Sequence, residues 1–228
     1  MNLTPEERDQ VAAELKRFGA DLKLTDDQRA KLQEFLTEAR AKVADYLKDE
    51  TNIAWSIPHF QTFLGLLAHR SGAERVHIIA HSMGNRAVCE ALRLLSYDPG
   101  NHIQLNHLVL AAPDIDAETF AELSRLLRRH SANITLYESR NDKALLASKK
   151  IHGYVRAGEP LLVLEGLDTV DASAIDTDFL GHSYFSSDYA LLSDIHSMLS
   201  SDEPAGRRIG LNTKENATGR YYEFRPRS

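Results

Sequence analysis

The segment that most constrains the fold is residues 78–86, which read IIAHSMGNR. An apolar run leads directly into a small-x-Ser-x-Gly turn, and a helical pattern follows. A turn this tight between a strand and a helix requires small residues on both sides of the serine. Ala80 and Gly84 meet this requirement, so Ser82 is predicted to stand exposed at the carboxyl end of a strand. The pattern is typical of a nucleophile elbow. The alternative is an ordinary strand–turn–helix connection in which the serine only caps the helix.

Short apolar runs alternate with helical stretches from about residue 53 onward. The predicted strands are 76–80, 108–111, 134–137 and either 161–164 or 167–170, and the predicted helices are 84–95, 117–129, 144–149 and 187–199. This alternation predicts parallel strands joined by right-handed crossovers, with helices on both faces of the sheet. The tail from residue 202 has little periodicity, although Tyr221, Tyr222 and Phe224 predict an edge strand there.

The first 50 residues have a different pattern, which predicts helices and no strand. Residues 4–7 (TPEE) form a capping box with proline at the first helical position. A second helix start follows at residues 25–28, and from residue 32 to residue 47 apolar side chains recur at the helical period. We therefore predict a helical hairpin over residues 1–50 and an α/β domain over residues 51–228.

A serine hydroxyl becomes a good nucleophile only when a base takes its proton and an acid orients that base. In this type of fold the chain order is Ser, then Asp or Glu, then His. Asp142 follows the third predicted strand, and His182 lies in the loop after the last strand, preceded by a glycine. These positions predict Asp142 as the acid and His182 as the base. The backbone N–H of Met83 is predicted to donate to an oxyanion, and His81 to shape the substrate pocket.

Four other aspartates compete with Asp142 for the role of the acid. Asp114 and Asp116 follow the second predicted strand, whereas Asp168 and Asp171 lie within or beside the last one. Asp142 is preferred because a short helix follows it and leaves room for the histidine loop. It is also predicted as the N-cap of that helix, and the two roles are compatible.

Composition and spacing exclude several other classes of protein. The chain of 228 residues has a formal net charge of −6, whereas nucleic-acid binders are basic. No paired Cys/His spacing predicts a metal site, and no glycine-rich phosphate loop predicts a nucleotide cofactor. The sequence has no run of about 18 apolar residues and no basic, apolar leader. We therefore expect a cytoplasmic protein without a membrane span, a cofactor or a nucleic-acid partner.

Four separated motifs carry a resemblance to a known family. They are residues 52–60 (NIAWSIPHF), 80–86 (AHSMGNR), 139–145 (SRNDKAL) and 181–185 (GHSYF). In this order they resemble the bacterial α/β-hydrolases of unknown function, a branch of the lipase/esterase superfamily, over about residues 50–225. The resemblance implies an α/β-hydrolase fold and carries Ser82, Asp142 and His182 over as the catalytic triad. It does not supply a substrate.

The chain departs from that family at its start. Family members open with an apolar strand that ends in a His-Gly loop, and this loop provides the second oxyanion N–H beside the elbow. The present chain has no His-Gly before Ser82 and no predicted strand before Val76. The resemblance thus implies a sheet truncated on its N-terminal side, with the strand that bears Ser82 at or near an edge. We expect the helical hairpin, or a second copy of the chain, to cover that edge.

Together these features predict a serine hydrolase that cleaves a small-molecule carboxylic ester or thioester through an acyl-Ser82 intermediate. The rival hypothesis is a catalytically weak remnant that serves as an interaction or structural module. The missing His-Gly loop favours the remnant, because loss of one oxyanion donor lowers turnover about 10²–10³-fold in other hydrolases. The intact serine, aspartate and histidine favour the enzyme.

Overall fold

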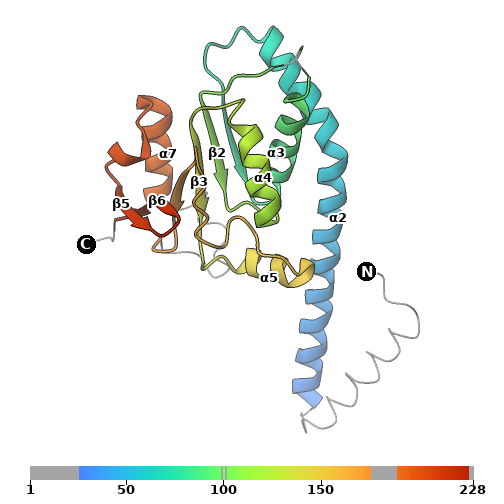
Figure 1. Cartoon of the computed structure of the whole chain (residues 1–228). Helices are drawn as coiled ribbons and strands as arrows, with labels where there is room; N and C mark the ends of the chain where they lie inside the picture. Colours follow the sequence, from blue (N-terminus) through green and yellow to red (C-terminus); the bar gives the residue numbers. More distant parts are fainter. Residues whose placement is uncertain (1–25, 99, 101, 176–188, 226–228) are drawn as a thin grey trace. The chain divides into compact units, whose positions relative to one another are not determined.

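The structure is a computed structural model of the whole chain, and it describes residues 26–98, 100, 102–175 and 189–225 (Figure 1). The chain divides into two compact units, Met1–Thr51 and Asn52–Ser228. Helix α2 (Asp26–Arg70) supplies the described part of the first unit and continues into the second. The first arm of the predicted helical hairpin, before residue 26, lies outside the described residues.

Helix α2 is longer than the sequence predicted. The predicted helical region ended near residue 50, but the helix continues to Arg70 with Pro58 inside it. Leu64 is buried, and Phe60 and Leu67 pack against the same core. An apolar face at helical spacing therefore holds this part of the helix against the larger unit, despite the proline.

Six strands form one sheet with the order β1-β2-β3-β4-β6-β5. Strands β1 (His77–His81), β2 (His107–Ala111), β3 (Ile134–Glu138), β4 (Asp168–Asp171) and β6 (Gly219–Phe224) are parallel, and β5 (Leu211–Asn216) is antiparallel to β6. The helices are α3 (Gly84–Leu95), α4 (Ala117–Leu127), α5 (Lys143–His152) and α7 (Tyr189–Ser201), with a 3₁₀ turn at Ala205–Arg207. The predicted α/β-hydrolase-type sheet is confirmed.

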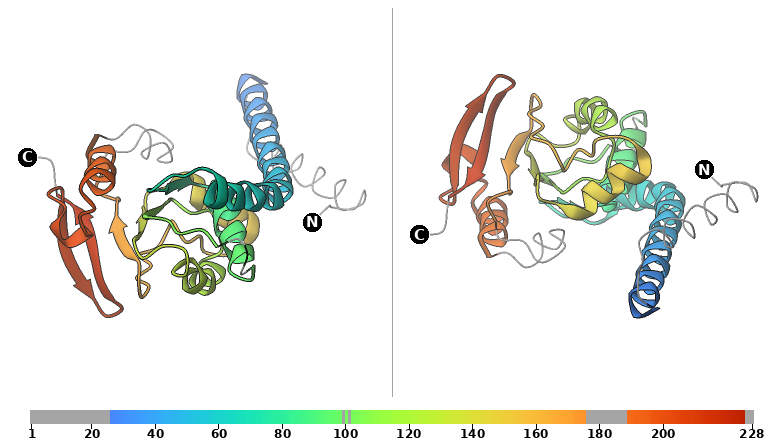
Figure 2. Two further views of the ribbon diagram at one scale, coloured as in Figure 1. Left: turned by 90° about the horizontal axis from the view of Figure 1, so that it is seen from above. Right: turned by 90° about the horizontal axis from the view of Figure 1, so that it is seen from below.

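Two apolar clusters fill the two faces of this sheet. On one face, Phe120 of α4 packs in the cluster that contains Leu108 of β2. On the other face, Leu191 of α7 packs in the cluster that contains Val109, the next residue of the same strand. Figure 2 shows α4 and α7 on opposite sides of the strands. Successive residues of β2 thus serve two different layers, as expected for a parallel sheet with helices on both faces.

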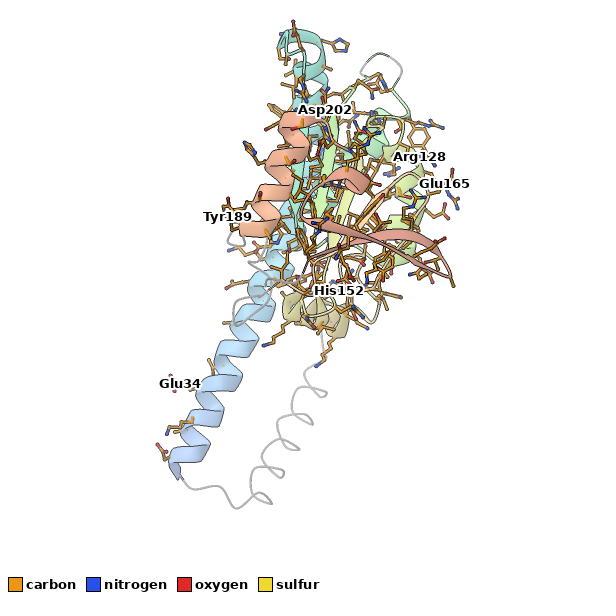
Figure 3. All side chains as sticks on the ribbon, turned by 90° about the vertical axis from the view of Figure 1, so that its left-hand side faces the viewer. Glu34, Arg128, His152, Glu165, Tyr189 and Asp202 are labelled. Carbon is orange, nitrogen blue, oxygen red and sulfur yellow. The ribbon has the colours of Figure 1, made fainter. Side chains whose placement is uncertain are left out.

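Helix α7, which follows the loop predicted to carry the base, is anchored at its C-terminal end. Asp202, which is labelled in Figure 3, accepts hydrogen bonds from Nη2 of Arg75 and Nε2 of His107, both at 2.7 Å. The bond from His107 is the main reason why the pKa of Asp202 lies below its usual value. Because Arg75 precedes β1 and His107 begins β2, these contacts tie the end of α7 to the start of both strands.

The C-terminal tail contributes two strands instead of the one predicted edge strand. Residues 221–224 do form a strand, but β6 lies between β4 and β5, so the predicted edge position is wrong. The edge is β5, which the sequence analysis missed. Oδ1 of Asn216 accepts hydrogen bonds from the N–H groups of Thr218 and Gly219, and Gly219 has a φ of +139°. This turn reverses the chain and adds the extra strand.

Strand β1, which leads to Ser82, is at the other end of the strand order. Of the described residues that precede it, those from 26 to 70 form one helix, and no strand is found among them. As the sequence analysis expected, the strand that bears the serine is therefore an edge of the described sheet.

Candidate active site

Ser82 occupies the turn between β1 and α3, at the carboxyl edge of the sheet. Its φ is +53°, in the left-handed region that residues with a side chain rarely adopt. Its N–H still continues the strand ladder by donating to the carbonyl of Ala111 at 3.0 Å. A strained serine between a strand and a helix is the backbone geometry of a nucleophile elbow.

A buried asparagine holds this turn in place. Asn85 is fully buried, and its Nδ2 donates to the main-chain oxygens of Ser82 and Ala111, each at 2.9 Å. The Ser82 carbonyl also accepts from the N–H groups of Asn85 (3.1 Å) and Asp114 (3.3 Å). These bonds tie the turn to the loop after β2, so its surroundings impose the unusual φ of Ser82. Sequence reasoning missed Asn85; the available signal was an amide side chain three residues after the serine.

The two residues that flank Ser82 lie in different environments. Met83 is the N-cap residue of α3, and within the described residues no side chain caps this helix. Among the described residues, none accepts a hydrogen bond from the Met83 N–H. This N–H is therefore available as a donor beside the serine. His81 is the last residue of β1 and is half-buried.

Asp142 lies at the same carboxyl edge, after β3. Its Oδ1 accepts hydrogen bonds from the N–H groups of Ala144 and Leu145, both at 3.0 Å, so its predicted role as the N-cap of α5 is confirmed. The residue is fully buried. Only β2 separates β1 from β3, which places the two strands about 10 Å apart. At that spacing a further side chain is needed to connect Asp142 with Ser82.

His182, the predicted base, lies outside the described residues. In the chain it falls between the end of β4 at Asp171 and the start of α7 at Tyr189. Strand β4 is parallel to β3 and adjacent to it, so the chain leaves β4 at the carboxyl edge where Asp142 lies. The position of His182 relative to Ser82 and Asp142 stays a prediction.

Two of the competing aspartates follow β2, and each is engaged by other groups. Asp114 is buried, pairs with Nε of Arg156 at 3.2 Å and accepts a hydrogen bond from Oγ of Ser148 at 2.6 Å. Asp116 is the N-cap of α4 and accepts from the Thr119 N–H at 2.8 Å. That bond is the main cause of a pKa of Asp116 below its usual value. Both carboxylates thus have structural roles in the loop beside the elbow.

The other two competitors belong to β4. Asp168 accepts a hydrogen bond from the Ala205 N–H at 3.4 Å, and Asp171 pairs with Nη2 of Arg140 at 2.9 Å. These contacts connect β4 to the C-terminal tail and to the loop after β3. Of the five aspartates, only Asp142 lies directly after β3, and its role as the acid stays a prediction.

Glu138, the last residue of β3, carries a buried carboxyl group that the sequence pattern did not indicate. Glu138 is 2% exposed, and its Oε2 accepts a hydrogen bond from the Leu162 N–H at 2.9 Å. Burial raises the pKa of Glu138 to about 9; the Leu162 bond lowers this pKa, the charge of Asp171 raises it and that of Arg140 lowers it. Glu138 is therefore protonated at neutral pH and adds no negative charge at this edge of the sheet.

Replacing Glu138 with glutamine is expected to flatten the pH dependence of stability between about pH 5 and pH 9. The pKa is about 9 in the native state against a usual value of 4.5, so in this window the native chain keeps a proton that the unfolded chain has released. The free energy of unfolding therefore falls as pH rises, by up to about 1.4 kcal/mol per pH unit for this group. Urea unfolding of the wild type and of Glu138→Gln at several pH values in this window measures the free energy of unfolding of each protein. Plots of this free energy against pH that run parallel for the two proteins would contradict the prediction.

No metal or membrane feature is found in the part of the chain that the structure describes. No group of three or more His, Cys, Asp or Glu side chains there is placed to hold a metal ion. No described helix is both long enough and apolar enough to cross a bilayer.

The sheet, the elbow and the order of the site residues define an α/β-hydrolase. Residues 20–199 match the family model described as alpha/beta hydrolase of unknown function (DUF900), and the chain belongs to this family. The matched segment contains Ser82, Asp142 and His182, and membership supports a hydrolase-like function. No curated protein and no solved structure matches the chain.

Proposed function

We propose that this protein is a serine hydrolase that cleaves a small-molecule carboxylic ester or thioester through an acyl-Ser82 intermediate. The observation that carries the proposal is the left-handed φ of Ser82, which is held between a strand and a helix by the buried Asn85. Strain that the surrounding structure maintains at a serine is expected at a reactive position and is unnecessary in a simple helix cap.

The proposed mechanism uses three side chains and one backbone group. Oγ of Ser82 attacks the substrate carbonyl carbon while His182 accepts the hydroxyl proton. Asp142 orients the imidazole and stabilises its protonated form, and the Met83 N–H donates to the oxyanion. His182 then returns the proton to the leaving alcohol or thiol. A water molecule, activated by the same histidine, hydrolyses the acyl-serine and regenerates the hydroxyl.

The oxyanion site sets the expected speed of this reaction. The Met83 N–H stands at the N-terminus of α3, a helix of 12 residues whose dipole also favours negative charge. Residues 1–81 contain no His-Gly pair that would supply a second donor. A site that relies on the Met83 N–H alone is expected to turn over about 10²–10³-fold more slowly than a hydrolase with two donors.

An interaction module without turnover is the second candidate function. The observation that favours it is the edge position of β1, because an open strand edge pairs readily with another strand. This candidate needs no activated serine, so the two hypotheses differ in the reactivity of Ser82.

Labelling by a fluorophosphonate probe tests the proposal. The wild-type protein is expected to be labelled at Ser82, and Ser82→Ala and His182→Ala to lose labelling, because the probe reacts only with an activated hydroxyl. Ser193→Ala, which removes an exposed hydroxyl on α7, is the matched control and should label like the wild type. A folded wild-type protein that is not labelled would contradict the proposed hydrolase function and favour the interaction module.

A further inference from the structure

We propose that Gly158 is a positioning residue, which fixes the turn that carries Ser82 and the turn that carries Asp142 relative to each other. The inference rests on the proposed serine-hydrolase function and adds a further residue to it. It is carried by two backbone hydrogen bonds of Gly158, by the close packing of this glycine and by a buried ion pair beside it.

Residues 155–158, here called the strap, cross the carboxyl ends of β2 and β3. The strap runs antiparallel to the loop that follows β2. The Val155 carbonyl accepts a hydrogen bond from the Ala117 N–H at 2.9 Å, and the Ala157 N–H donates to the Ile115 carbonyl at 2.8 Å. Figure 1 shows α5, from which the strap continues, at the end of the sheet toward which the arrow of β2 points. The strap therefore lies at the edge that carries the candidate active site.

The N–H of Gly158 reaches the loop that holds the nucleophile turn. It donates to the Pro113 carbonyl at 3.0 Å. The next residue in that loop, Asp114, donates its own N–H to the Ser82 carbonyl at 3.3 Å, and its carbonyl accepts from Nε of Arg86 at 2.9 Å. Gly158 is thus connected to the serine turn through two successive backbone hydrogen bonds.

The carbonyl of Gly158 reaches the turn that carries the predicted acid. It accepts a hydrogen bond from the Ser139 N–H at 2.9 Å, and the Ser139 carbonyl accepts from the Asp142 N–H at 3.3 Å. Ser139 is fully buried, and its Oγ also accepts from the Asn141 N–H at 3.2 Å. One peptide segment therefore joins the two turns, although the strands that lead to them are about 10 Å apart.

Gly158 packs so closely on the end of β2 that a side chain does not fit there. A Cβ atom would lie 2.6 Å from the carbonyl carbon of Ala112, whereas ordinary contacts begin at 3.4 Å. Ala112 is fully buried with a φ of +43°, so its backbone has little freedom to yield. The carbonyl of Ala111, the residue before it, accepts from the Ser82 N–H. A methyl group at position 158 would therefore push the strap away from the nucleophile turn.

A buried ion pair ties the strap to the same loop. Nε of Arg156 lies 3.2 Å from Oδ1 of Asp114, and both side chains are 3% exposed. The same oxygen accepts a hydrogen bond from Oγ of Ser148 on α5 at 2.6 Å. Because Asp142 caps α5, these contacts hold the strap, the loop after β2 and the helix of the predicted acid together.

The rate of fluorophosphonate labelling in Gly158→Ala tests the proposal. The variant is expected to react about 100-fold more slowly than the wild type, because a displacement of about 1 Å at a catalytic site costs about that factor. With an activated aryl ester, kcat should fall by a similar factor, while KM changes less than about threefold. Gly153→Ala is the matched control and should label like the wild type. Gly153 has a φ of +80° and open space around it, so the methyl strains the backbone without displacing the strap.

A double variant separates positioning from a general loss of stability. In a chain that already carries Asp142→Asn, Gly158→Ala is expected to slow labelling less than about tenfold, because residues that act as a unit do not have additive effects. The full 100-fold slowing in this background would overturn the proposal. Equal slowing in Gly153→Ala and Gly158→Ala would overturn it as well.

Arg156→Lys is a milder variant, and it decides the question if Gly158→Ala does not fold. It is expected to slow labelling about tenfold, because lysine keeps the charge but not the geometry of the pair with Asp114. Lys149→Met is its control and should label like the wild type, because Lys149 pairs at 2.8 Å with Glu159, just beyond the strap. An unlabelled wild type would overturn the proposed function and this inference with it. A labelled wild type that Arg156→Lys and Gly158→Ala match in rate would overturn the positioning role alone.

Discussion

Replacing Asp142 with asparagine is expected to lower turnover by about four orders of magnitude while the protein stays folded. The carboxylate has two separable roles, because Oδ1 caps α5 through Ala144 and Leu145 and the negative charge would hold the imidazole of His182. Asparagine is as good an N-cap as aspartate, so the helix keeps its cap and only the charge is lost. Hydrolysis of an activated aryl ester, with the rate of fluorophosphonate labelling, measures the effect.

A second variant at the same position separates capping from catalysis. Asp142→Ala removes both roles and is expected to destabilise the protein by about 1 kcal/mol in addition to the loss of turnover. Turnover of Asp142→Asn within tenfold of the wild type would show that the residue only caps the helix. The acid would then have to come from another carboxylate, and Asp114→Asn would be the next variant, because Asp114 follows β2 beside the elbow.

Replacing Arg208 with methionine is expected to destabilise the protein by about 3–5 kcal/mol. Nη1 of Arg208 lies 2.9 Å from Oδ2 of Asp194, and both side chains are 1% exposed. Tyr137 of β3 also donates to this carboxylate, at 2.5 Å. Burial raises the pKa of Asp194, while the charge of Arg208 and the bond from Tyr137 lower it. Without the guanidinium, α7 would bury a carboxylate that has lost its counter-charge.

A double variant distinguishes the charge effect from lost packing. Asp194→Leu combined with Arg208→Met removes both charges and is expected to recover most of the lost stability, because a buried ion pair is often no better than apolar residues of similar volume. Urea unfolding of the two single variants and the double variant measures the coupling. A loss of less than about 1 kcal/mol in the free energy of unfolding for Arg208→Met alone would contradict the role of Arg208 as the counter-charge of the buried Asp194.

The parts of the molecule that the sequence predicted well are those set by local chemistry. Strands β1, β2 and β3 agree with the predicted strands within about one residue at each end, and α3 agrees at both ends. The turn at Ser82 follows from small residues on either side of the serine, and the cap at Asp142 from a single side chain and its own helix. Such features depend on neighbours within a few residues, which the sequence displays directly.

Contacts between segments far apart in the chain account for the features that the sequence did not predict. Pro58 lies inside α2, where a proline usually ends a helix, because residues beyond it bury an apolar face on the larger unit. Strand β6 is internal because β5 folds back beside it, a pairing that needs the turn at Asn216 and the free side of β4. The bonds that Asn85 makes and the raised pKa of Glu138 arise only when distant segments bury these side chains.

By itself the sequence determined the alternation of strands and helices, the turn that carries Ser82, the cap at Asp142 and the membership of a hydrolase family. Only the tertiary structure decided that β5 and not β6 ends the sheet, how the serine is held in its strained conformation and which buried carboxyl keeps its proton. The physical reason is that backbone propensity acts over a few residues, whereas strand order, burial and electrostatic environment depend on segments brought together from across the chain.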